Sequence, residues 1–330
     1  MAGISATQVV TELGAYIRAN NKEVKSWFYK AGSPLFQYCR TITKIKGKYP
    51  SFHSITDHVV QAFASTWNEI GTTHFKVNEL MAHHIKVNYP IIPSDIEASW
   101  LGELNEEDLA LADKSISRYI MERELKPKVM EDICDLVVNG DIDSGDDYLE
   151  SIDGIIQVIA NGLANTDNPM YKVLLSAIIT DSNIVDLITE YVKKLPKKAR
   201  RNIKAIFMST TNLDRYRERY EAQFGTSNLI SLAATTKDRI AGIPLVGIDE
   251  LEGSNLIFST IDGNMVKLVD TFTDPPQITD IQTLDYKVKI FMEGHLGINF
   301  LINQAVFVAQ FSGSDSGLAS ASQNELYYIN

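Results

Sequence analysis

The chain has 330 residues, of which 45% are hydrophobic and 22% charged, proportions that are ordinary for a folded soluble protein. This length suits one large domain or two smaller domains, each with its own core. No stretch reaches the ~18 consecutive apolar residues of a membrane span. The N-terminus also lacks a basic region followed by an apolar one, so we expect neither a transmembrane segment nor a signal peptide.

The net charge of −11 is unevenly distributed along the chain. Residues 1–48 contain eight basic and two acidic side chains, so this segment carries +6 and the remainder −17. A basic arm on an acidic body favours contact between copies of the same protein. Contact of the arm with nucleic acid and an ordinary solvated basic segment are the alternatives.

Residues 1–56 are predicted to form an N-terminal arm and its lead-in rather than a domain. Residues 7–19 have the apolar spacing of one amphipathic helix. Aromatic residues and lysines follow as far as Tyr38, interrupted by Gly32, Ser33 and Pro34. We expect that this segment cannot bury its rings within its own chain and needs a partner surface.

Residues 57–90 are predicted to be a long two-stranded excursion. Residues 59–67 alternate as a strand does, but the same apolar positions also fit a helix, so the local structure stays open. Residues 71–73 predict a turn, and residues 84–89 alternate clearly as the returning strand. Pro90 ends that strand.

Residues 91–140 carry the strongest helical signals. Ser94 and Glu97 form a capping box that predicts a short helix to Leu101. A much longer helix is predicted from Glu106 to Val138, about 50 Å at the usual rise per residue. Pro127 predicts a kink or a break within it, because proline removes a backbone donor and crowds the preceding turn.

Residues 141–285 are predicted to form a mixed α/β subdomain, so that the whole chain belongs to the α+β class. An acidic turn opens it, and helices then alternate with short strands. The expected elements are a buried segment 155–159, a helix 184–195 capped by Ser182, a strand 203–209, a helix 213–224, and strands 242–253, 255–259 and 263–269. Residues 286–330 contribute closing strands up to Ala309 and a loose tail, 312–322.

Candidate chemical sites are few, and each has a simpler explanation. His83 and His84 are adjacent on a predicted strand, so their side chains point to opposite faces and do not chelate one ion. The segment 140–147 is similar to a calcium loop but lacks the required glutamate, because Ile152 occupies that position. Cys39 and Cys134 fit no metal or redox spacing, which favours two buried thiols. With no phosphate loop or nucleophile elbow, we assign no catalytic, cofactor-binding or metal residues and expect a protein that is not an enzyme.

The order of the segments is more informative than any motif. Trp67-Asn68-Glu69, Val137–Asp141 (VVNGD), Thr236–Gly247 (TKDRIAGIPLVG) and Val288–Val308 follow one another across some 250 residues. In this order they resemble pieces of the major capsid protein of tailed bacteriophages, a fold also used by encapsulin nanocompartments.

The resemblance implies a role for each segment. Residues 57–90 would be the extended loop, 91–140 the peripheral domain with its spine helix, 141–285 the axial domain, and 286–330 the final strands of the peripheral domain and the tail. The chain would self-assemble as hexamers and pentamers into an icosahedral shell around double-stranded DNA, which it would not bind specifically.

The resemblance also implies partners and a location. The protein would be part of the virion, assembled in the host cytoplasm with separate scaffolding, portal and decoration proteins, and without a membrane. An encapsulin-type compartment is the first alternative. A soluble α/β hydrolase is the second, although no nucleophile or metal site supports it.

Overall fold

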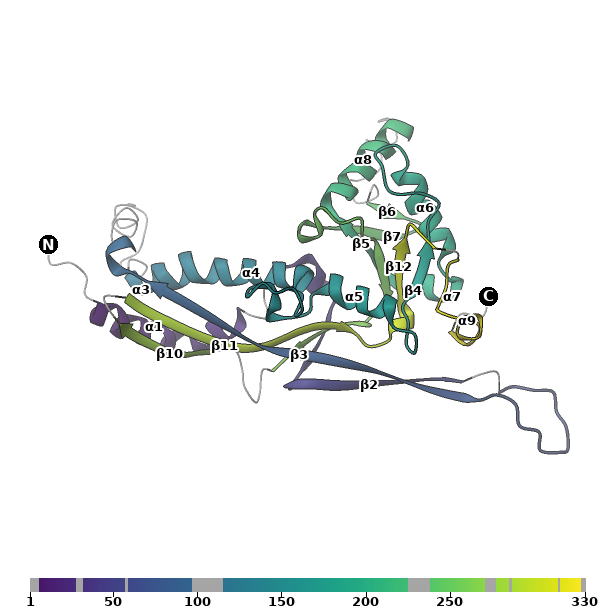
Figure 1. The fold of residues 1–330 in the computed structure, drawn as a ribbon, viewed down its shortest axis with the longest axis horizontal. Coiled ribbons are helices and arrows are strands. Elements are labelled where there is room, and N and C mark those ends of the chain that lie inside the picture. The colour runs from purple at the N-terminus through teal and green to yellow at the C-terminus, as the bar shows by residue number, and fades with distance from the viewer. Residues whose placement is uncertain are drawn as a thin grey trace.

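The computed structural model describes residues 6–27, 32–56, 59–96, 115–224, 238–270, 277–284, 287–313 and 315–327. The predicted α+β class is confirmed, because long strands and helices both contribute to the core. Figure 1 shows a long, flat lower part, a second part standing on it, and a hairpin that runs out past both.

The first sheet forms the lower part. Its order is β1-β9-β11-β3-β2, with β10 also paired to β11, and among these pairs only β1–β9 is parallel. The strands are β1 (Arg40–Thr43), β2 (Gly47–Thr56), β3 (Thr73–Ile91), β9 (Met265–Val269), β10 (Gln277–Leu284) and β11 (Lys287–Phe300).

A long helical segment lies along this sheet. It consists of α3 (Ile116–Arg118), a π-helical segment (Tyr119–Leu125) and α4 (Lys126–Asn139). The wide π-helical turns end just before Pro127, which therefore sits in the first turn of α4. Proline is tolerated there because its missing N–H is not required, so the predicted interruption takes the form of a π-helical segment. The predicted helical residues 97–101 and 106–114 lie outside the described residues.

The second sheet forms the upper part. Its order is β4-β12-β8-β5-β7-β6, with β12–β4 and β5–β7 parallel. The strands are β4 (Tyr171–Leu174), β5 (Ile203–Ser209), β6 (Arg239–Ile240), β7 (Ile243–Ile248), β8 (Phe258–Ile261) and β12 (Val306–Gln310). The helices of this half are α5 (Ile155–Ala164), α6 (Ile184–Lys194), α7 (Lys197–Arg200), α8 (Thr210–Phe224) and α9 (Ala321–Tyr327). Single 3₁₀ turns are at Pro34–Gln37, Leu149–Ser151, Asp249–Leu251 and Asn303–Ala305.

Aromatic rings join the two sheets. Phe207 of β5 stacks on Phe258 of β8 with ring centroids 5.0 Å apart, and Phe258 meets Phe300 of β11 edge-on at 6.4 Å. Tyr38 packs edge-on against Phe207 at 5.2 Å from the other side. Such pairs add to the free energy of simple burial, by about 0.5–1.5 kcal/mol each. The main core therefore spans both sheets, and a second core lies within the upper part.

The N-terminal segment corrects one prediction. The helix α1 (Ala6–Ser26) packs against β10 and α3, and Leu13, Trp27 and Leu35 are buried in the main core, with Trp27 only 1% exposed. The expectation that this arm must bury its rings on a partner is therefore wrong for these residues. Phe28 and Tyr29 lie outside the described residues.

The excursion begins earlier than predicted. Its first strand is β2, which starts at Gly47 and pairs with β3 from Gly47↔Ala82 to Thr56↔Thr73. Residues 59–72 form neither the strand nor the helix that the sequence left open. The apolar alternation of residues 59–67 therefore lies in the connection between the strands, and neither alternative is correct.

The closing strands also change partners relative to the prediction. β9 joins the first sheet, although it was predicted within the subdomain 141–285, and β12 joins the second, although the resemblance assigned it to the peripheral domain. The tail is not loose throughout, because Gly317 and Lys172 exchange two backbone hydrogen bonds at 2.8 Å. The helix α6 begins at Ile184 after Asn183, so Ser182 is not its cap.

Tyr191 provides a test of the second core. Its ring is fully buried, and its hydroxyl lies 2.8 Å from Ser259 Oγ and donates to the Phe307 carbonyl oxygen at 2.8 Å. Tyr191→Phe leaves both partners buried without this bond, which should lower the free energy of unfolding by about 1–3 kcal/mol. Chemical denaturation measures the change. Tyr49→Phe, at an exposed ring, is the control and should change it by less than about 0.5 kcal/mol.

Gly140 provides a test of the junction between α4 and α5. A Cβ at this position would meet the carbonyl oxygens of Ile152 and Leu136, the latter at 2.6 Å. Gly140→Ala should therefore destabilise the protein by about 1–3 kcal/mol, because backbone must shift. Gly14→Ala, in the middle of α1 with open space around it, should instead stabilise it by about 0.5–1 kcal/mol. Equal effects in thermal melts would contradict this account of Gly140.

Candidate functional site

The hairpin of β2 and β3 is anchored to the body by one face only. Lys76 Nζ donates to the Asp167 carbonyl oxygen at 2.8 Å, and Asn168 Nδ2 donates to that of Val77 at 3.3 Å. Asn78 Nδ2 donates to the Phe300 carbonyl oxygen at 2.6 Å and to Asn303 Oδ1 at 2.9 Å. Polar contacts from the α5–β4 connection and the end of β11 thus hold the inner face.

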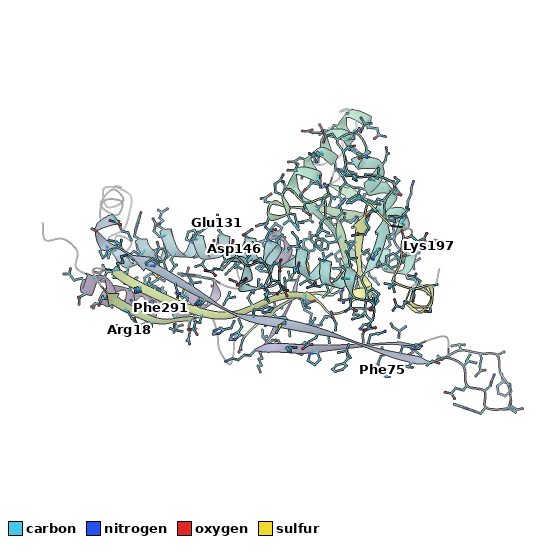
Figure 2. The ribbon with its side chains drawn as sticks, in the orientation of Figure 1. Arg18, Phe75, Glu131, Asp146, Lys197 and Phe291 are labelled. Carbon is cyan, nitrogen blue, oxygen red and sulfur yellow. The ribbon has the colours of Figure 1, made fainter. Side chains whose placement is uncertain are left out.

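The outer face of the hairpin carries exposed apolar side chains, together with the Lys48–Glu79 ion pair at 2.7 Å. Phe52 pairs with Val77, and the next pair on the same face is Ser54 with Phe75. Phe52 is 71% and Phe75 is 74% exposed, with Val77 and Met81 also exposed. Figure 2 shows Phe75 on the extended part of the hairpin. We define the outer apolar face as Phe52, Phe75, Val77 and Met81.

The connection between the two strands carries further exposed apolar side chains. Phe63 is 97% and Trp67 is 93% exposed, and Val59 and Val60 are exposed as well. Gln61 Nε2 donates to the Asn68 carbonyl oxygen at 2.6 Å, which ties the two sides of the connection together. We call residues 59–72 the hairpin tip.

Uncovered apolar surface on this scale needs a partner. Isolated apolar side chains on a protein surface are ordinary, but a contiguous set along one face marks an interaction site. A two-stranded hairpin is also only marginally stable on its own in water. Covering these rings would contribute roughly 25 cal/mol per Å² of apolar area, which gives binding a strong driving force.

The predicted metal candidates are not brought together. His83 and His84 lie on β3 and His84 stacks on His295 of β11, with ring centroids 4.6 Å apart. His84 Nε2 is 3.3 Å from Glu293 Oε2. Burial lowers the pKa of His83. Within the described ranges, no three His, Cys, Asp or Glu side chains form a set that could hold a metal ion.

The acidic turn after α4 uses some of its carboxylates to cap its own backbone. Asp141 Oδ1 accepts from the Asp143 N–H at 3.1 Å, and Asp146 Oδ1 accepts from the Tyr148 N–H at 2.9 Å.

Both cysteines are free thiols and only partly buried in this fold. Burial raises the pKa of the Cys39 thiol to about 12, so it stays protonated at neutral pH.

Sequence reasoning did not single out Phe52, Phe75 or Val77. The period-two pattern of β3 was a usable signal, because apolar Phe75 and Val77 alternate with Lys76 and Asn78. An amphipathic strand usually turns its apolar face toward the core of its own chain, whereas here the polar face is turned toward the body.

None of the helices in the described part of the chain combines the length and apolar character that crossing a bilayer requires.

Comparison with known proteins identifies the fold. Searches of sequence-family models and of curated proteins return no match. Among solved structures, a chain from the capsid of an empty GTA particle aligns with 86% of this chain and 97% of its own length, at 16% identity and a TM-score of 0.55.

Other capsids give similar alignments. A chain from the satellite phage P4 procapsid matches 88% of this chain and 98% of its own length, at 10% identity and a TM-score of 0.52. A chain from the capsid of Myoviridae phage XM1 matches 86% and 92%, at 8% identity and a TM-score of 0.52. This chain therefore has the major capsid protein fold of tailed phages.

Replacing Phe52 and Phe75 by Ser should separate interaction from stability. Because both rings are exposed, the double variant should keep its free energy of unfolding to within about 0.5 kcal/mol. Its self-association, measured by sedimentation velocity, should fall strongly. Leu80→Ser, at a fully buried position of β3, is the control and should cost several kcal/mol, roughly the 2–5 expected in a core. Unchanged self-association of the double variant would exclude the outer apolar face as an interface.

Proposed function

We propose that this chain is the structural subunit of an icosahedral shell that encloses the double-stranded DNA of a tailed bacteriophage. The observation that carries the proposal is the hairpin, which is fixed to the body on one face and has uncovered rings on the other. Alignment of almost the full length of known capsid chains supports it. The protein's function would then be its shape, and it would not be an enzyme.

The segments take the following roles in this proposal. The hairpin, extended to residues 47–91 by the strand pairing, is the extended loop that lies on a neighbouring subunit. The first sheet and the segment 116–139 form the peripheral domain. The second sheet with α6–α8 forms the axial domain, which gathers around the axes of hexamers and pentamers.

The partners follow from the same proposal. The subunit assembles with copies of itself and with separate scaffolding, portal and decoration proteins in the host cytoplasm, and it becomes part of the virion. Packaged DNA lies beside the shell without specific recognition, since a net charge of −11 disfavours tight binding to phosphates. The solved structures that align with this chain are capsids of phages and of GTA particles, which favours a phage shell over an encapsulin-type compartment.

Electron microscopy of the purified chain tests the proposal. At moderate concentration the chain should form rings, sheets or closed shells, alone or after addition of a scaffolding protein encoded beside it. The Phe52 and Phe75 double variant should form far fewer. Small monodisperse particles of the wild-type chain under every salt and protein concentration would refute the proposal.

A further inference from the structure

One flank of the second sheet is strongly basic. Residues 193–204 contain seven basic side chains and no acidic one. They run from the end of α6 through α7 into β5, and six of the seven are exposed, with Arg200 partly so. Only Lys194 and Lys204 have an ion pair among the described residues, with Glu190 at 2.7 Å and Asp262 at 3.5 Å. We call residues 193–204 the basic flank.

A second surface is strongly acidic. Residues 141–153 contain six acidic side chains and no basic one. None of the six has an ion pair among the described residues, and Asp143, Asp146, Asp147 and Glu150 are exposed. Glu131 and Asp132 of α4 lie close by, since the Tyr148 hydroxyl donates to the Asp132 carbonyl oxygen at 3.0 Å, but both pair with Lys128 and add little free charge. We call residues 141–153 the acidic flank.

The two flanks lie on opposite sides of the upper part of the molecule. In Figure 2, Asp146 and Glu131 lie to the left of the second sheet and Lys197 lies to its right. Figure 1 shows the same separation, with α7 beyond the sheet from α4 and α5. Since this view is down the shortest axis, the flanks are separated within the plane of the flat molecule.

Opposite charges on opposite sides suit a head-to-tail contact between copies. Contacts that use two different surfaces of the same chain close into rings when the rotation allows it. Complementary charge steers such contacts and fixes their register, while like charges brought together cost several kcal/mol, roughly the penalty that excludes wrong arrangements. The chain therefore carries both halves of one electrostatic interface.

We propose that the basic flank of one subunit docks on the acidic flank of the next subunit around the ring. The inference rests on the proposed function and adds the surfaces that order the subunits. Double-stranded DNA is the alternative partner for the basic flank. The acidic flank favours a second copy, because a DNA-binding surface alone would leave that acidic surface without a role.

Charge reversal tests the pairing. The first variant changes five exposed basic residues to Glu, which takes the basic flank from +7 to −3: Lys193, Lys197, Lys198, Arg201 and Lys204. The second changes the four exposed acidic residues to Lys, which takes the acidic flank from −6 to +2: Asp143, Asp146, Asp147 and Glu150. The third carries both sets of substitutions in one chain.

Each single-flank variant alone should form about tenfold fewer rings or shells than the wild type at about 0.1 M salt, because like charges would face each other. The variant with both flanks reversed should assemble, since complementarity returns. It is the control for the effect of the substitutions themselves, and circular dichroism melts test whether all three variants fold.

Mixing gives a sharper result. An equimolar mixture of the two single-flank variants should assemble with strict alternation, because both flanks of the first are then negative and both flanks of the second positive. Alternation closes rings with an even number of subunits, so hexamers should form and pentamers should not. Negative-stain class averages and native mass spectrometry measure both.

The outcomes separate this inference from the proposed function. Wild-type yields of rings from either single-flank variant alone, or no rescue in the mixture, would overturn the flank pairing while leaving a shell function intact. Normal rings from the first variant together with lost affinity for double-stranded DNA would assign the basic flank to nucleic acid and overturn the pairing. A wild-type chain that never assembles would overturn the proposed function and the pairing together.

Discussion

The strand β3 exchanges its pairing partner between Ala82 and His83, and much of the structure depends on that exchange. Up to Ala82 it pairs with β2, and from His83 onward with β11. The exchange brings β3 very close to Gly297, where a Cβ would meet the Met81 carbonyl oxygen. One continuous strand of 19 residues, about 60 Å at the usual rise, thus runs from the buried core into the hairpin. Whatever the hairpin contacts is connected directly to the core by backbone.

A sheet normally buries one face against a second layer, and the hairpin has no such layer from its own chain on its outer side. On the inner face, the polar side chains of Lys76 and Asn78 are hydrogen-bonded to the body. The outer face then presents aromatic rings with no polar atoms to satisfy. Covering such a surface needs shape and area but no new hydrogen bonds, which suits a contact repeated many times between identical subunits. The charged flanks would supply the direction that an apolar contact lacks.

The sequence predicted the elements whose type and bounds follow from their own apolar spacing. The strand β5 and the helices α6 and α8 lie within a few residues of their predicted bounds, because their apolar spacing is clear. The order of the major segments was also readable. The sheet that each closing strand joins could not be predicted. β9 and β12 are both buried along almost their whole length, and such a pattern fits a strand of either sheet. The burial of Trp27 depended on contacts far along the chain, and the outer apolar face was missed because a period of two does not say which face meets the core.

The aromatic rings from Tyr38 to Phe300 have a mechanical consequence. The contacts between Tyr38, Phe207, Phe258 and Phe300 cross the junction of the two sheets and leave it close-packed. Packed cores resist gradual deformation, so the angle between the two halves is a fixed property of the subunit. A surface tiled by such subunits can change its curvature only where the chain is thinly packed. In the proposed shell, the hairpin would be that place, because its outer face is not covered by its own chain.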